Sequence, residues 1–245
     1  VLAGDDVCLV TAGNLGLECA RIFLQKLAAS TNEEDQKPYA ACAGVAMVHV
    51  KFPFHRAYAL SESLCSQAKK YVAQIDPQSR ISAMDWHIEF GQMRDSLSKI
   101  RAEYETEDGR RMELRPVVVS APQEISLPPQ KTYRFFKALC GSMQKNSRQI
   151  ARSKLKELRN ALRQGEVESR FFLQDKQISD LLYDGIEAQF HTWEERREQY
   201  ENMIFRNARL QKEAFAETDG QVRCLFFDAL EMMDHCVFLE EGETP

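Results

Sequence analysis

An apolar run from residue 40 to residue 50 constrains the fold of this chain more than any other feature. The run consists almost entirely of small and β-branched apolar residues, and His49 is its one polar side chain. A strand with one wet face alternates apolar and polar residues, whereas an unbroken apolar run is typical of a strand buried on both faces. We therefore expect this segment to form a central strand of a sheet.

Two segments flank this run, and each repeats its apolar residues at the 3.6-residue period of a helix. In the first, Asn14 is expected to cap a helix whose apolar face carries Leu17, Ala20, Leu24, Leu27 and Ala28. The second extends from His55 to Val72, and its apolar face carries Ala57, Leu60, Leu64, Ala68 and Tyr71. Both patterns indicate helices that pack on the sheet.

Residues 81–90 alternate between apolar and polar side chains, which predicts a half-buried strand. The expected apolar face carries Met84, Trp86, Ile88 and Phe90, and the opposite face carries Asp85, His87 and Glu89. On that polar face His87 would meet either a ligand or, more simply, water. A further strand is expected between Arg111 and Val119, at an edge of the sheet because Pro116 has no backbone N–H.

A proline-rich stretch from Ala121 to Pro129 is the best candidate for a linker. Strands and helices alternate before it, and the helical period dominates after it. Apolar stripes mark the later helices at residues 150–162, 178–193 and 222–237. The sequence therefore predicts an α+β region at residues 1–120, followed by a mainly α-helical accessory region at residues 121–245.

The composition excludes several classes of protein. No apolar stretch is long enough to cross a membrane, and no basic start leads into an apolar segment as in a secretory signal. The net charge of −5 argues against a protein that coats nucleic acid through charge alone. Seven scattered cysteines, without a Cys-x-x-Cys pair, predict reduced core thiols in a cytoplasmic protein.

The residues with the clearest chemical potential lie at the start of the chain, where Ala3-Gly4-Asp5-Asp6 separates two short apolar runs. This arrangement predicts a β-hairpin with adjacent carboxylates at its turn. Two neighbouring aspartates repel each other, so a fold that keeps them together usually neutralises them with a cation, and Mg²⁺ prefers such oxygen ligands. For the motif alone, an ordinary Gly-Asp turn is the commoner explanation.

An ordered series of motifs resembles one family. Val1–Val10 is similar to the signature hairpin, written GGDD, of the cyclase and polymerase palm in the large subunit of type III CRISPR effector complexes, with Ala3 at the first glycine. The same hairpin topology occurs in GGDEF-type diguanylate cyclases. Ala43–Ala46 resembles the central strand of the palm, and Leu64–Lys69 resembles its nucleotide-contacting helix. Ser82–His87 and Leu114–Pro116 resemble later landmarks of stand-alone proteins with this palm.

The resemblance implies a ferredoxin-like palm, with an antiparallel sheet and helices on one face, that binds ATP or another nucleoside triphosphate with Mg²⁺ or Mn²⁺. It implies metal-binding and catalytic roles for Asp5 and Asp6, nucleotide contacts for Ala3 and Gly4, and neutralisation of the triphosphate by Lys69. Members of the family join nucleotides, often into cyclic oligonucleotide messengers of antiviral defence. Their palm opens with a further aspartate-bearing strand and a helix, so we expect coding sequence upstream of Val1.

A catalytically inactive palm is the alternative function that the sequence leaves open. Such a protein would be a nucleotide-binding or scaffold subunit of an effector complex. The strongly basic segment at residues 145–163 could contact RNA or an acidic protein partner, although a solvated helix face explains the same charges more simply. Asp234-His235-Cys236 and His191 lack the second ligand pair of a zinc site, and a polar helix end is the simpler explanation for them.

Overall fold

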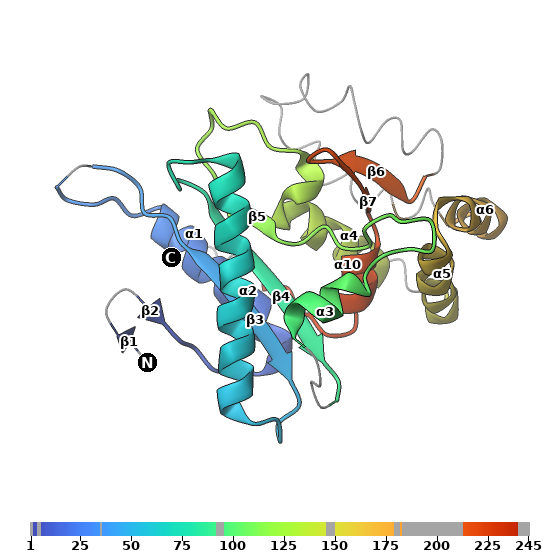
Figure 1. Cartoon of the computed structure of the whole chain (residues 1–245), viewed down its shortest axis with the longest axis horizontal. Helices are drawn as coiled ribbons and strands as arrows, with labels where there is room; N and C mark the ends of the chain where they lie inside the picture. Colours follow the sequence, from blue (N-terminus) through green and yellow to red (C-terminus); the bar gives the residue numbers. More distant parts are fainter. Residues whose placement is uncertain are drawn as a thin grey trace. The chain divides into compact units, whose positions relative to one another are not determined.

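Figure 1 shows the computed structural model of the protein, which describes residues 2–3, 6–34, 36–91, 96–145, 150–178, 182 and 213–239. The chain forms two compact units. The first contains Val1–Arg94, Val119–Pro122 and His235–Pro245, and the second contains Asp95–Val118 and Gln123–Asp234. The α+β class is confirmed. The expected boundary at residue 120 differs from this division, because residues 95–118 belong to the second unit.

The first unit contains a three-stranded sheet, two long helices and a separate hairpin. Its elements are β1 (Leu2–Ala3), β2 (Asp6–Val7), the short 3-10 helix η1 (Gly13–Leu15), α1 (Gly16–Ala28), β3 (Cys42–Val48), α2 (Phe54–Ile75) and β4 (Ser82–Glu89). β5 (Val117–Ser120), whose last two residues belong to this unit, completes the strand order β3-β4-β5. The hairpin of β1 and β2 is not part of this sheet.

The sheet differs from the antiparallel sheet that the family resemblance implies. β3 and β4 run parallel, with Cys42 opposite Ala83 and Val48 opposite Glu89. Parallel neighbours require a crossover connection, and the 22-residue helix α2 provides it between these two strands. The correction therefore follows from the strand–helix–strand order of residues 42–89.

The expected roles of the two longer strands are reversed. β4, predicted to be half-buried, is the middle strand and is buried along residues 82–88. β3, predicted to be central, is an edge strand in this sheet and is mostly half-buried. The polar residues of β4 are thus buried rather than exposed to solvent, and His87 is only 4% exposed. The prediction that His87 faces water is wrong.

Helices cover both faces of this sheet, not one face as expected. Gly44 lies against α2, because a Cβ atom placed there would overlap the backbone of that helix. Its neighbour Val45 points to the opposite face, where a Cβ placed on Gly16 at the start of α1 would lie 3.1 Å from the Val45 Cγ1 atom. Figure 1 accordingly shows α2 in front of β3 and β4 and α1 behind them.

The sequence predicted the apolar face of α2 well and that of α1 in part. Leu60, Leu64, Ala68 and Tyr71 are buried as expected on α2. On α1, Leu17 and Leu24 are buried, but so is the ion pair of Glu18 and Arg21, whose Oε1 and Nε atoms lie 2.9 Å apart. Asn14 lies within η1 and does not cap α1. The spacing of the apolar residues could not predict that a charged pair also lies on the buried face of α1.

The second unit is mainly helical in its described residues. Its elements are α3 (Leu97–Ala102), the 3-10 helix η2 (Pro129–Lys131), α4 (Tyr133–Lys145), α5 (Arg152–Gln164), α6 (Glu166–Lys176), β6 (Phe215–Thr218), β7 (Gln221–Cys224) and α10 (Phe227–Met232). The stripe of Leu155, Leu158 and Leu162 on α5 is buried as predicted. The helix expected at residues 178–193 lies outside the described residues, except for the buried residues Ile178 and Leu182.

The helix expected at residues 222–237 is confirmed only over α10, Phe227–Met232. Val222 belongs to β7, which pairs antiparallel with β6. Asp219 and Gly220 connect the two strands, and both have positive φ angles of 53° and 74°. Such angles at both central residues suit a two-residue hairpin turn, and Asp-Gly is a favoured sequence for it. Local turn chemistry therefore prevails over the helical spacing of the apolar residues.

A buried ionic network organises the second unit around Arg115. The Arg115 side chain is fully buried, and its guanidinium nitrogens lie 2.6 Å from a Glu231 carboxylate oxygen and 3.5 Å from one of Asp228. The other Asp228 oxygen accepts hydrogen bonds from the backbone N–H groups of Leu114 and Arg115. Lys131, also buried, donates to the Leu114 carbonyl. The stretch expected to be a linker thus leads directly into a packed core.

Two chain-wide expectations concern the cysteines and the membrane. All seven cysteines carry free thiols, and Cys140, Cys224 and Cys236 are buried. The other four are half-buried. Among the helices of the described ranges, none combines the length and the apolar composition that crossing a membrane requires.

Replacement of Gly44 by alanine tests the contact between β3 and α2. The new methyl group would overlap the Ser61 carbonyl oxygen and the Cys65 amide nitrogen, and it would lie 2.9 Å from the Leu64 Cβ atom. Because backbone atoms cannot rotate away, we expect Gly44→Ala to lower the free energy of unfolding by at least about 3 kcal/mol in urea denaturation followed by circular dichroism. Gly13→Ala is the matched control, since no atom lies within 4 Å of its new methyl group.

Replacement of Arg115 by methionine tests the ionic network. We expect a loss of about 3–5 kcal/mol in the free energy of unfolding, because two buried carboxylates lose their cation. Burial raises the pKa of Asp228, and Arg115 opposes that rise. The loss should therefore be larger at pH 8 than at pH 5, where the unpaired carboxyl groups take up protons more readily. Arg152→Met, at a side chain that is 71% exposed, should change stability by less than about 1 kcal/mol.

Candidate functional site

The predicted hairpin at the start of the chain is confirmed. β1 and β2 pair antiparallel, with Leu2 opposite Val7 and Ala3 opposite Asp6. Gly4 and Asp5 are therefore the two residues between the strands, and Asp6 occupies the first pair beside the turn. Asp6 is exposed. Gly4, Asp5 and the side chain of Ala3 lie outside the described residues, so Asp6 is the hairpin carboxylate whose surroundings can be analysed.

Asp6 acts electrostatically on two residues of α2, Tyr58 and Cys65. The pKa of the Tyr58 phenol is raised, mainly by the Glu62 carboxylate, and Asp6 contributes in the same direction. Burial raises the pKa of the Cys65 thiol, Lys69 opposes that rise, and Asp6 adds to it. Asp6 and Lys69, the two described residues with predicted charged roles, therefore both influence the thiol of Cys65.

The two residues on which Asp6 acts belong to one stripe along α2. Tyr58, Glu62, Cys65 and Lys69 are separated by four, three and four positions, which places them on one face of the helix. We call this set the α2 stripe. Glu62 and Lys69 are exposed, whereas Cys65 is half-buried. The stripe therefore presents an acid, a thiol and a cation in sequence along the helix.

The packing of α2 on β3 fixes the position of this stripe. The Cys65 thiol donates a hydrogen bond to the Cys42 carbonyl oxygen at a sulfur–oxygen distance of 3.2 Å. The Cys65 amide nitrogen is also one of the backbone atoms that leave no space for a side chain at Gly44. Cys65 is thus held against the sheet from both its backbone and its side chain, and Lys69 follows one helical turn later.

The described acidic side chains suit a magnesium ion that binds together with a nucleotide. They suit a metal ion held by protein ligands alone less well. Within the described ranges, no cluster of three or more His, Cys, Asp or Glu side chains has the geometry to hold a metal ion. Mg²⁺ needs no such cluster, because it usually keeps several waters and binds one or two carboxylates together with substrate phosphates. The exposed carboxylate of Asp6, with Asp5 next to it in sequence, satisfies that smaller requirement.

The residues of the weakly predicted zinc site have other contacts. Asp234 lies 3.4 Å from Arg152 within the second unit. In the first unit, the ring of His235 lies 5.2 Å from that of Phe90, and Cys236 is buried. His191 is outside the described residues. These contacts explain the three described residues through packing and charge pairing.

The basic helix α5 presents less free charge than its sequence suggests. Arg152 is paired with Asp234, and the Arg159 guanidinium lies over the Phe227 ring at 5.7 Å from its centre. Lys156 and Arg163 are exposed. Residues 146–149, which belong to the predicted basic segment, lie outside the described part of the chain. Arg152 and Arg159, two of the predicted basic residues, therefore already have partners within this protein.

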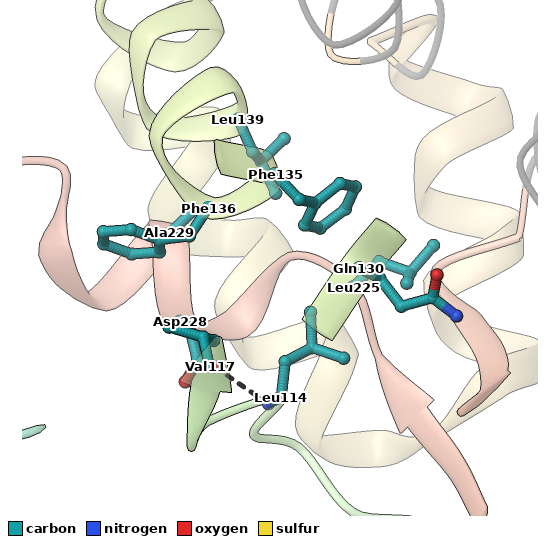
Figure 2. Close-up of a pocket in the computed structure, with 9 residues that line it drawn as sticks. All are labelled: Leu114, Val117, Gln130, Phe135, Phe136, Leu139, Leu225, Asp228 and Ala229. Atoms are coloured by element: carbon teal, nitrogen blue, oxygen red, sulfur yellow. Dashed lines mark hydrogen bonds between the residues drawn. The ribbon is translucent and has the colours of Figure 1, made fainter. Parts of the chain in front are cut away.

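A small cavity in the second unit is too small for a nucleotide. Figure 2 shows its lining, in which the Leu114 N–H donates to the Asp228 carboxylate beside mostly apolar side chains. The remaining lining residues are Val117, Gln130, Phe135, Phe136, Leu139, Leu225 and Ala229. Its volume of about 10 Å³ corresponds to roughly one water molecule. It is a packing defect beside the ionic network.

Two comparisons, with protein-family profiles and with curated proteins, give no match. The candidate site therefore depends on its own residues: the hairpin with Asp6 and the α2 stripe.

The α2 stripe escaped the sequence analysis, apart from Lys69. The apolar period of residues 55–72 directs attention to the buried face of the helix, whereas Tyr58, Glu62 and Cys65 lie on another face. The sequence does contain a pattern for this face, because Tyr58, Glu62, Cys65 and Lys69 also recur at helical spacing. Only the position of the hairpin beside α2 distinguishes it from an ordinary solvated surface.

Thiol reactivity tests the arrangement of Asp6, Cys65 and Lys69. Removal of the cation in Lys69→Met should raise the pKa of Cys65 and slow its reaction with a disulfide reagent at pH 8, whereas Asp6→Asn should lower the pKa and accelerate the reaction. The rate at Cys65 is followed by mass spectrometry of the labelled peptide, with Cys65→Ser as the blank. Lys70→Met is the control for a lysine that does not act on this thiol. Equal rates in all variants would contradict the arrangement.

Proposed function

We propose that this protein is a metal-dependent nucleotidyl transferase, which joins nucleoside triphosphates into linked oligonucleotides. One observation supports the proposal beyond the sequence motifs. A hairpin carboxylate, Asp6, and a helix cation, Lys69, shift the pKa of the same thiol in opposite directions, and this thiol, that of Cys65, is fixed against β3 by its hydrogen bond to the Cys42 carbonyl oxygen. A triphosphate with its magnesium ion needs this combination of charges, because the metal requires carboxylates and the phosphates require a cation.

Each predicted residue has a defined role in this proposal. Lys69 neutralises the triphosphate, Asp5 and Asp6 hold the metal, and Ala3 and Gly4 line the nucleotide. The small residues at positions 3 and 4 leave room for a phosphate to approach the hairpin backbone. The metal, when bound, activates a 3′-hydroxyl group and stabilises the leaving pyrophosphate.

The alternative is a palm that binds nucleotide without turning it over, as a scaffold subunit of an effector complex. The exposure of Asp6 supports this alternative, since catalytic charges usually work in sites from which water is excluded. Both functions suit a cytoplasmic protein. RNA contact through α5 would be secondary in either case, because Arg152 is paired with Asp234 and the Arg159 guanidinium lies over the Phe227 ring.

Calorimetric titration with ATP and Mg²⁺, followed by analysis of the products, tests the proposal. We expect the wild-type protein to bind ATP and to release pyrophosphate. Lys69→Ala should weaken binding about 10-fold or more, because a charge-assisted contact contributes roughly 1.5–3 kcal/mol. The double variant Asp5→Asn/Asp6→Asn should abolish pyrophosphate release, while Glu34→Gln, at an exposed acid that belongs to neither the hairpin nor the α2 stripe, should leave both properties unchanged.

The outcomes separate the two functions. Release of pyrophosphate that depends on Asp5 and Asp6 supports the transferase. ATP binding that depends on Lys69, without turnover of ATP or GTP, supports the scaffold. Absence of binding to any nucleoside triphosphate would overturn both.

A further inference from the structure

Two aromatic side chains on the first turns of α2 are exposed beside the candidate site. The Phe54 side chain is 62% exposed and that of Tyr58 is 40% exposed. Their ring centroids lie 6.4 Å apart, and the ring planes are tilted by 35°. The two rings therefore form a single aromatic surface in contact with solvent. A single exposed apolar residue needs no explanation, but a pair of rings next to a cluster of charges is a feature of surfaces that bind nucleotides.

The aromatic pair is continuous with the α2 stripe. Phe54 precedes Tyr58 by one helical turn, and Tyr58 is the first residue of the stripe. The Glu62 carboxylate, one helical turn later, is the main cause of the raised pKa of the Tyr58 phenol. Asp6 and Cys8 of the hairpin segment also contribute to the raised pKa of the Tyr58 phenol. The rings thus belong to the helix face on which the candidate metal ligand acts.

The charges along the stripe define a direction for a bound nucleotide. Glu62 lies next to the rings and disfavours phosphates at that end of the stripe. Lys69 is the cation of the stripe, eleven residues after Tyr58, or about 16 Å along the helix axis. Side chains on a helix lean toward its N-terminus, so the Lys69 ammonium reaches back toward the rings. An elongated ligand with an apolar end and an anionic end matches this order.

We propose that Phe54 and Tyr58 form a stacking platform for the base of the nucleoside triphosphate, whose phosphates extend toward Lys69. This inference rests on the proposed function and specifies where the base of its substrate binds. Stacking uses the face of a base rather than its hydrogen-bonding edge, so the platform accepts different bases. The platform therefore contributes affinity, and any choice between ATP and GTP must depend on other residues.

Binding of two ligands that differ only in the presence of a nucleoside tests the platform. Affinities for Mg²⁺–ATP and for Mg²⁺–tripolyphosphate are measured by calorimetry on the whole chain. We expect Phe54→Ala and Tyr58→Ala each to weaken ATP binding about 5-fold to 150-fold, the equivalent of one base–aromatic stack, and to leave tripolyphosphate binding unchanged. Lys69→Ala should weaken both ligands. Tyr58→Phe, which keeps the ring, should retain most of the ATP affinity.

Tyr39→Ala is the matched control, since Tyr39 is a similarly exposed tyrosine, at 44%, outside the α2 stripe. It should bind both ligands like the wild type. Unchanged ATP affinity in Phe54→Ala and Tyr58→Ala, while Lys69→Ala still loses affinity, would overturn the platform and leave the proposed function standing. An equal loss for ATP and tripolyphosphate in the aromatic variants would also overturn it. If the wild type binds neither ligand, the proposed function itself fails.

Discussion

The contact between α2 and β3 at Gly44 is the constraint on which the first unit depends. With no side chain at that position, the backbone of α2 at Ser61 and Cys65 rests directly on the strand. The opposite face of β3 meets the start of α1 near Val45, so the sheet lies between two helices. This sandwich explains why the polar residues of β4 are buried and why the fold uses a parallel pair of strands.

The same contact also determines what the outer surface of α2 presents. Because Cys65 is held against β3, residues one turn before and after it have a fixed height along the sheet. On this surface rings, an acid, a thiol and a cation follow one another, and a hairpin carboxylate acts on both the phenol and the thiol. A rigid element that carries spaced chemical groups gives a binding surface more geometric precision than a loop does.

The apolar period predicted the existence of both helices of the first unit and most of the buried face of α2, because burial of one helix face leaves a strong periodic signal. Strand roles were predicted less well. The uncharged residues 42–48 suggested a central strand, yet the alternating segment 82–89 occupies that position, since burial depends on covering helices that no local pattern reveals. The site was predicted as isolated residues, and Tyr58 and Cys65 emerged only from the position of the hairpin beside α2.

The network around Arg115 links residues that are far apart along the chain. Its carboxylates come from Asp228 and Glu231, more than one hundred positions later, and in the first unit the Val237 N–H donates to the Asn14 carbonyl. Both units therefore remain incomplete during synthesis until the segment at residues 213–239 has left the ribosome. Contacts of such long sequence separation fold slowly. Until that segment arrives, the Arg115 guanidinium stays hydrated, and its burial comes late in folding.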